Sequence, residues 1–406
     1  MRRFEAQAAI VSAANLLGRM TPSVALCFPD APVHAALPWA GQSLHGIILA
    51  QMRVADPHGR FQARSAEKAD FIFHIGPDGS ESVVHGVGWN AYIGPRPSPL
   101  PDGDDANPFG ATLAVILAAS QLFVHNFAVP AEPFACNALD WKNEIAHDTP
   151  AFKPAPALGN IWTVGAGSVG TAALYYLTLA TRNFSTALID HDEVKLHNLD
   201  RSPVFIETDI GDTKVEATRD YLKSVGLQDV RIDPHPLHES SLWHGRPAGT
   251  PDVIIAAANE KKVRYYIEAG YPPLQLYATT GQNWQTTLLR HEPFGKACSL
   301  CLFPADEAPT STACASVPVS ESDTGEERVD AALPFLSFAA GLMTACETVK
   351  RLLPGFPFNA DRVFLHTKPT PSLVSARIRH RDGCFCEFRD AALHRAMLTP
   401  GKLVTA

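Results

Sequence analysis

The sequence predicts an α/β fold built on a doubly wound, mostly parallel sheet. Three features indicate it: apolar strands alternate with helical segments, the first strand runs into a glycine-rich turn, and an acidic residue ends the second strand. Strands that alternate with helices usually pair in parallel, because the chain must cross back over the sheet between two parallel strands, and a helix makes that connection. The expected strands are 160–164, 184–190, 253–257 and 274–278, and the expected helices are 172–179, 214–223 and 261–269.

The glycine-rich turn predicts a nucleotide-binding site. It reads Gly165-Ala-Gly167-Ser-Val-Gly170, follows the first strand and opens a helix, and Asp190 stands 20 residues after its last glycine. Glycines let the backbone approach a phosphate, the helix N-terminus favours an anion, and the acidic side chain can hold ribose hydroxyls. A lone glycine motif is weak evidence, but this strand–turn–helix context is specific.

Composition excludes several classes of protein. The chain has 406 residues, 46% of them hydrophobic and 19% charged, which is typical of a globular protein of two or three domains. Its formal net charge of −8 disfavours nucleic acid as a partner, and no apolar run is long enough to span a membrane. The first 17 residues resemble a signal peptide, but Glu5, Gln7 and Asn15 interrupt the apolar stretch. We therefore expect a cytoplasmic protein.

A proline-rich segment divides the chain. Residues 141–158 are predicted to link an N-terminal domain, 1–140, to the domain at 159–406. In the first part, strands are expected at 71–75 and 82–85, and the apolar helix 107–123 resembles another at 333–349. This likeness predicts an internal repeat whose N-terminal copy lacks the glycine turn, and two unrelated buried helices are the alternative. Residues 302–332 are predicted to form a long loop.

Two further motifs carry a family resemblance. The run Asp190 to Arg201 reads D-x-D-x-V-x-x-x-N-L-x-R, and the run 209–216 reads D-I-G-x-x-K-V-E. Together with the glycine turn they resemble the ThiF/MoeB and ubiquitin-activating-enzyme superfamily over residues 158–390. The resemblance implies a Rossmann-like adenylation fold that uses ATP and Mg²⁺. The ATP-binding residues that it implies are Gly165, Gly167, Gly170, Asp190, Asp192, Asn198, Arg201, Lys214 and Asn259.

Three of these positions are tied to the chemistry of adenylation. The resemblance implies that Arg201 and Lys214 contact the triphosphate and offset the charge that builds when a carboxylate attacks the α-phosphate. The alternative for both is a solvated surface charge. Asn259 stands where the family places a magnesium-binding aspartate. An amide oxygen can bind Mg²⁺ without supplying charge, and the neighbouring Glu260 offers a carboxylate.

Four of the eight cysteines form two tight pairs, Cys298 with Cys301 and Cys384 with Cys386. In a chain of this length such pairs indicate a metal site sooner than a disulfide framework. The resemblance implies a structural Zn²⁺ held by all four thiolates, although the second pair is C-x-C where the family usually has C-x-x-C. Four reduced core cysteines are the alternative.

Cys314 is the candidate nucleophile. It lies in the predicted loop among small residues that leave its sulfur accessible, and the resemblance implies a catalytic cysteine in this segment. An incidental loop thiol is the alternative. Cys346, on an apolar helix, is expected to be a packing residue.

The resemblance implies an enzyme that adenylates the C-terminal carboxylate of a ubiquitin-like protein ending in glycine. The acyl group would pass to Cys314 and then to a conjugating enzyme. An inactive first half before an active second half is typical of the conjugation branch, and the activating enzyme of a bacterial antiphage (Bil-type) conjugation operon is the nearest candidate. The alternatives are a ThiF/MoeB-type adenylyltransferase acting on a sulfur carrier or a peptide, and a nucleotide-binding scaffold without catalysis.

Oligomeric state stays open between a homodimer and an internal pseudo-dimer. Relatives complete their ATP site with an arginine from the partner half, for which Arg3 and Arg19 are candidates here.

Overall fold

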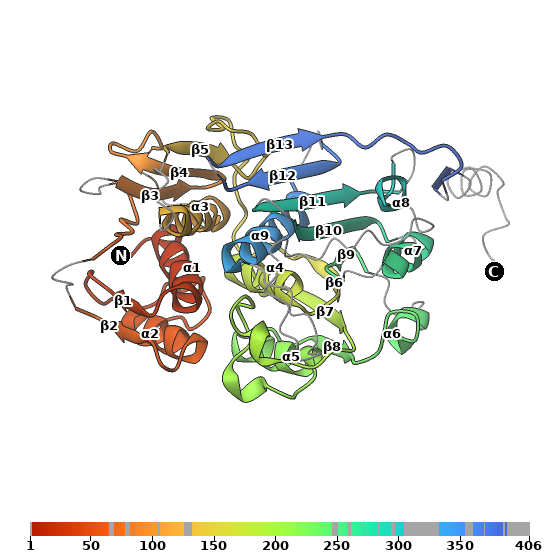
Figure 1. Cartoon of the computed structure of the whole chain (residues 1–406), viewed down its shortest axis with the longest axis horizontal. Helices are drawn as coiled ribbons and strands as arrows, with labels where there is room; N and C mark the ends of the chain where they lie inside the picture. Colours follow the sequence, from red (N-terminus) through yellow and green to blue (C-terminus); the bar gives the residue numbers. More distant parts are fainter. Residues whose placement is uncertain are drawn as a thin grey trace, which may run out of the picture.

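A computed structural model of the chain gives the architecture (Figure 1). It describes residues 2–64, 69–77, 82–101, 103, 106–125, 132–245, 251–258, 261–270, 272–281, 284–293, 297–303, 333–353, 360–368, 370–384 and 386–387.

The main sheet has eight strands in the order β13-β12-β11-β10-β9-β6-β7-β8, which Figure 1 shows from top to bottom. The strands paired in parallel are β6 (Gly159–Val164), β7 (Phe184–Ile189), β8 (Val230–Asp233), β9 (Val253–Ala256) and β10 (Leu274–Gly281). The antiparallel extension consists of β11 (Gln285–His291), β12 (Arg362–His366) and β13 (Ser372–Ala376). The predicted α/β class with a mostly parallel sheet is confirmed.

Helices connect these strands. They are α4 (Ser168–Ala180), α5 (Lys214–Ser224), α6 (Ser241–His244), α7 (Lys261–Gly270), α8 (Ser299–Leu302) and α9 (Pro334–Lys350), with short 3₁₀ turns at Leu196–Asn198 and Glu207–Asp209. Helices α4 and α9 are apolar on most sides and pack directly against each other. A Cβ added at Gly341 would lie 2.4 Å from Cβ of Ala172, so this close helix crossing requires glycine.

The described residues before β6 form two small sheets and three helices. The elements are α1 (Phe4–Met20), β1 (Ser23–Ala25), α2 (Leu44–Ala55), β2 (Arg60–Gln62), β3 (Ser82–Val87), β4 (Asn90–Pro95), α3 (Phe109–His125) and β5 (Phe134–Asn137). Strands β1 and β2 pair in parallel, and β3, β4 and β5 form an antiparallel sheet. The strand predicted at 71–75 is wrong, because only Ile75 pairs there, in an isolated bridge to Val84.

Helix α3 packs on the β3–β5 sheet and also on α9, which in turn packs on β10 and β11. Of the two helices compared in the sequence, α3 therefore covers an antiparallel sheet, and α9 covers the antiparallel pair β10–β11 of the main sheet. An internal repeat stays a prediction.

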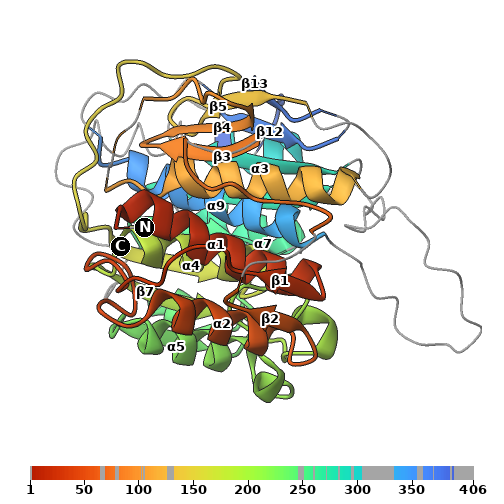
Figure 2. The ribbon, with the colours of Figure 1, turned by 90° about the vertical axis from the view of Figure 1, so that its left-hand side faces the viewer.

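Helix α1 is an internal part of the fold (Figure 2). The three polar residues that interrupt its apolar stretch all bond to the main chain: Glu5 accepts from N of Gly88, and Gln7 and Asn15 donate to the carbonyls of Pro32 and Pro203. They are buried, so these bonds offset the cost of removing polar groups from water.

A buried ionic cluster joins the N-terminal residues to the main sheet. Glu347 of α9 accepts hydrogen bonds from Nε1 of Trp141, at 2.7 Å, and from Arg290 of β11, at 3.0 Å. Lys350, one turn further along α9, pairs with Glu347 and donates to the carbonyls of Ala138 and Leu139. The N-terminal part and the main sheet also share one hydrophobic core.

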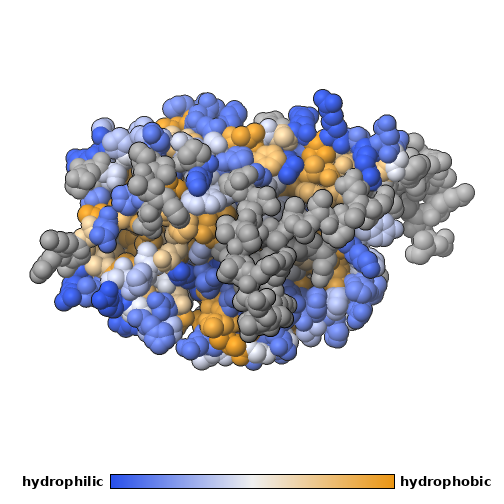
Figure 3. Space-filling model, in the orientation of Figure 1, coloured by the Kyte–Doolittle hydropathy of each residue, from blue (hydrophilic) through white to orange (hydrophobic). Residues whose placement is uncertain are grey.

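Among the described residues no helix is long and apolar enough to cross a membrane. The face drawn in Figure 3 carries hydrophobic residues scattered among hydrophilic ones.

Candidate nucleotide and metal sites

The glycine turn joins β6 to α4 and leaves open space at the helix N-terminus. Gly165 has φ +94°, and a Cβ there would lie 2.6 Å from N of Ala258. A Cβ at Gly170 would lie 2.0 Å from the carbonyl oxygen of Gly165. Gly167, by contrast, is the N-cap of α4, and a Cβ there would meet no atom within 4 Å. The first and last glycines therefore permit tight packing, and the middle one leaves room for a phosphate beside the first N–H groups of α4.

Asp190 links the glycine turn to the following loop. Its Oδ2 accepts from N of Ala166 at 2.6 Å, and its Oδ1 accepts from N of Asp192 at 2.9 Å. Burial raises the pKa of Asp190, while the charge of Lys214 acts in the opposite direction. Because two backbone donors hold this carboxylate, its position relative to the turn is fixed before any ribose binds.

Lys214 begins α5 and points back at the same loop. Its ammonium lies 2.6 Å from Oδ2 of Asp192, and its backbone N donates to the carbonyl of Asp192. Although partial burial raises the pKa of Asp192, the hydrogen bond and charge of Lys214, together with smaller contributions from His191 and Lys195, hold that pKa below its ordinary value. The structure thus brings Gly165, Gly167, Gly170, Asp190, Asp192 and Lys214 together at the carboxyl ends of β6 and β7.

Asn198 and Arg201 lie on the loop between Asp192 and α5. The Oδ1 atom of Asn198 accepts from N of Lys195 at 2.9 Å and stabilises the short turn there. The side chain of Arg201 is 11% exposed. Burial lowers the pKa of His197, and the charges of Arg201, Lys195 and Lys214 lower it further. The charge of Asp200 acts in the opposite direction, but burial and the three cations together keep the pKa of His197 low. The sequence motifs do not indicate a role for His197.

Two predicted site residues, Asn259 and Cys314, lie outside the described residues. Their roles stay predictions. Cys346 is fully buried on α9, as expected of a packing residue.

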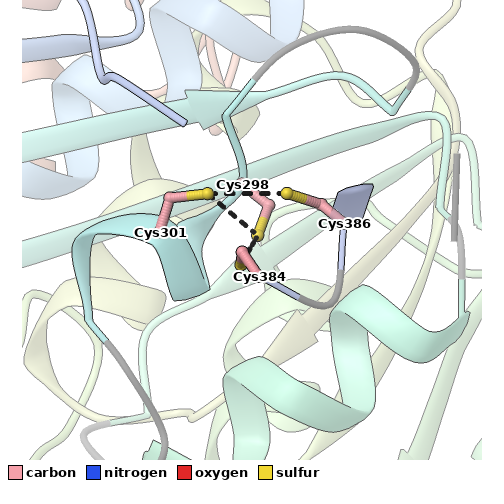
Figure 4. Close-up of side chains that lie close together, drawn as sticks. All are labelled: Cys298, Cys301, Cys384 and Cys386. Carbon is pink, nitrogen blue, oxygen red and sulfur yellow. Dashed lines mark hydrogen bonds between the residues drawn. The ribbon is translucent and has the colours of Figure 1, made fainter. Parts of the chain in front are cut away.

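The four paired cysteines converge on one point (Figure 4). Their Sγ atoms lie 3.5 Å apart for Cys301 and Cys386, 3.7 Å for Cys298 and Cys384, and 4.0 Å for Cys298 and Cys301. A tetrahedral zinc with Zn–S bonds of about 2.3 Å separates its sulfurs by about 3.8 Å. The residues present therefore fit zinc. All four are free thiols, and hydrogen bonding from Cys298 lowers the pKa of Cys386 to about 4.

A buried polar network supports this cluster, and no sequence motif indicates it. Glu268 of α7 accepts from both N and Oγ of Ser299, at 2.9 and 2.8 Å, where α8 begins beside Cys298. His291 of β11 lies 3.4 Å from the other carboxylate oxygen of Glu268, and both residues are fully buried. The network fixes the orientation of the first cysteine pair.

The ThiF family matches residues 159–386, more than half of the chain. With the glycine turn, the loop at 190–214 and the cysteine cluster all inside that range, the chain belongs to the ThiF family.

Curated relatives match about half of the chain. Adenylyltransferase and sulfurtransferase MOCS3 of Aedes aegypti is 28% identical over 209 residues, 51% of this chain and 44% of that protein. SAMP-activating enzyme E1 of Haloferax volcanii is 30% identical over 199 residues, 47% of this chain and 66% of that enzyme. The chain thus spans less than half the length of MOCS3.

Among solved structures, the chain is similar to E. coli MccB with ATP, with a TM-score of 0.41 and 14% sequence identity. The match covers 68% of this chain and 72% of the MccB chain.

Proposed function

We propose that the chain uses ATP to adenylate the C-terminal carboxylate of a small ubiquitin-like protein that ends in glycine. The observation that carries the proposal is the assembly at the carboxyl ends of β6 and β7. There the glycine turn, Asp190, Asp192 and Lys214 are joined by direct bonds. Membership of the ThiF family and the similarity to an adenylyltransferase and to an E1-type activating enzyme support the same reaction type.

In the proposed step, a carboxylate oxygen attacks the α-phosphorus of ATP, the bond between the α-phosphorus and the bridging oxygen breaks, and pyrophosphate leaves. Negative charge gathers on the phosphate oxygens during this step. The N–H groups at the start of α4 and the cations Arg201 and Lys214 would stabilise that charge, because fixed donors do so without reorganisation. Asp190 would hold the ribose.

Cys314 would then take the acyl group. Its thiolate attacks the carbonyl carbon of the acyl-adenylate, AMP leaves, and a thioester forms, from which a conjugating enzyme accepts the carrier. We place this activity in a bacterial antiphage conjugation system, as the paired-half organisation of the sequence suggests.

We propose that the protein binds two kinds of metal ion. Mg²⁺ would neutralise the phosphates when bound, with Asn259 as the candidate protein ligand. Zn²⁺ would be structural, held by Cys298, Cys301, Cys384 and Cys386, whose sulfur spacing fits it.

The test combines two assays. The protein is mixed with ATP, Mg²⁺ and a glycine-ended small protein encoded beside it, and the products are run on a nonreducing gel and weighed by intact mass. We expect a thiol-sensitive adduct that Cys314→Ala abolishes, while Cys27→Ala, which removes an exposed cysteine, leaves the adduct intact. ATP–pyrophosphate exchange is measured in parallel.

The outcomes separate the alternatives. Exchange without an adduct would keep adenylation and favour the sulfur-carrier or peptide branch, for which the name of the MOCS3 relative is the specific support. Neither signal, with the small protein shown to bind, would refute the enzyme and favour a nucleotide-binding scaffold.

A further inference from the structure

Helix α1 makes side-chain bonds to the loop that follows Asp192. Near its end, the guanidinium of Arg19 donates to the carbonyl oxygens of Leu199 and Phe205. Asn15, one turn earlier, donates from Nδ2 to the carbonyl of Pro203 at 2.9 Å and accepts from Nε of Arg19 at 3.1 Å. Two residues of one helix therefore hold three main-chain carbonyls of a loop 180 to 188 residues away in the sequence.

These contact points enclose a predicted site residue. Leu199 precedes Arg201 by two positions, and Pro203 and Phe205 follow it. Within the same stretch, the hydroxyl of Ser202 lies 3.0 Å from that of Thr171, on the first turns of α4. The loop is therefore fixed on one side by α1 and on the other by the helix that follows the glycine turn.

The bonds are suited to holding the loop in place. Asn15 is 4% exposed, and burial lowers the pKa of Arg19 to about 10, so its guanidinium remains charged at neutral pH. Bonds from a charged donor in a water-poor environment are stronger than neutral ones. Each nitrogen of the Arg19 guanidinium donates one bond, to the carbonyls or to Asn15, so in this arrangement it holds the loop backbone. In this arrangement Arg19 affects the nucleotide site by positioning Arg201 and does not itself bind a phosphate of ATP.

We infer that Asn15 and Arg19 are positioning residues for the nucleotide site, and that α1 of the N-terminal part sets the conformation of the 196–206 loop. This inference rests on the proposed function, because it assigns Arg201 and Asn198 to a bound triphosphate. By this inference the N-terminal residues contribute to ATP binding, in addition to packing in the same hydrophobic core as the main sheet.

Arg182 offers a matched control. It also joins the N-terminal part to the main domain, donating from Nη1 to the carbonyl of Ala36 at 3.1 Å and to that of Thr178 at the end of α4. It makes no hydrogen bond or ion pair with the 196–206 loop in the described part of the chain. Arg182→Ala thus removes an arginine bridge between the same two parts without touching the loop.

The test measures the dissociation constant of ATP with Mg²⁺ by calorimetry on the full chain, for wild type, Arg19→Lys, Asn15→Ala and Arg182→Ala. Hydrogen exchange of residues 196–206 is followed in each protein. Lysine keeps the charge but cannot span the two carbonyls and the Asn15 amide. We expect about tenfold weaker ATP binding and faster exchange in 196–206 for the first two variants, and wild-type values for Arg182→Ala.

Each outcome decides a point. Folded Arg19→Lys and Asn15→Ala proteins with wild-type affinity and wild-type exchange would overturn the inference. Equal weakening by Arg182→Ala would also overturn it, because the effect would then come from general contact between the two parts. A wild type that binds no ATP would refute the proposed function itself. If Arg19→Lys fails to fold, Asn15→Ala, which leaves the charge in place, decides alone.

Discussion

Replacing Lys350 by methionine tests whether the N-terminal part and the main sheet unfold together. Methionine has nearly the volume of lysine, so the substitution leaves little cavity and removes mainly polar interactions. Lys350 is 1% exposed, donates to the carbonyls of Ala138 and Leu139 at 3.0 and 2.8 Å, and pairs with Glu347. The substitution leaves Glu347 buried with one cation fewer.

Breaking one partner of a buried ion pair costs about 3–5 kcal/mol, because the remaining charge stays away from water. With an unfolding entropy of about 2.1 cal/mol/K per residue, the 406 residues correspond to about 0.85 kcal/mol/K. We therefore expect a fall in Tm of about 5 °C if the whole chain unfolds in one transition.

The assay is differential scanning calorimetry with urea unfolding. Lys142→Met is the control, because Lys142 pairs with Asp140 at 2.8 Å but its side chain is 58% exposed. Exposed pairs contribute at most about 1 kcal/mol, so this variant should melt within about 1 °C of wild type. Equal Tm values for the two variants would refute the reasoning. Two separate transitions, with only one shifted, would show that the parts unfold independently.

Further predictions concern the sites. Elemental analysis should show that Cys384→Ser loses most of the bound zinc. The control Cys27→Ser, at an exposed cysteine, should keep it. A wild-type protein without zinc would contradict the metal assignment. Lys214→Met should slow ATP–pyrophosphate exchange about 100-fold, whereas Lys223→Met, on the exposed end of the same helix, should not. Burial and nearby cations hold the pKa of His197 below 6.5. Below about pH 6.5 the unfolded protein therefore binds more protons at this residue than the folded protein does. We expect His197 to lower the stability of the folded protein as pH falls from about 6.5 through the lower pKa. ATP should raise this pKa in an NMR titration by offsetting the surrounding positive charge, and an unchanged or lowered value would place the triphosphate elsewhere.

Local sequence pattern sufficed for most of the nucleotide half of the fold, but it did not predict strand β8. Each predicted strand and helix from 160 to 278 exists within a few residues, because strand and helix periods and the glycine turn are encoded by near neighbours. The same holds for the link from the glycine turn to Asp190, since parallel strands that are adjacent in sequence end at the same edge of the sheet.

Pattern failed where partners are distant in the chain. The segment 71–75 is mostly apolar, with Phe71, Ile72 and Phe73 in succession, and so resembles a short strand, yet the structure gives it only the bridge at Ile75. The polar residues of α1 interrupt an apolar stretch, but nothing near them in the sequence indicates that Asn15 and Arg19 bond to a loop almost 190 residues away.

The sequence by itself determined the α/β class, the glycine turn, the residues of the adenylation motifs and the two cysteine pairs, because each depends on residue type and short spacing. Only the tertiary structure decided that the four sulfurs meet at 3.5–4.0 Å, that Glu268 supports them, and that α1 holds the 196–206 loop. The physical reason is that these contacts arise from packing between distant elements, and local preference does not specify which buried polar group meets which partner.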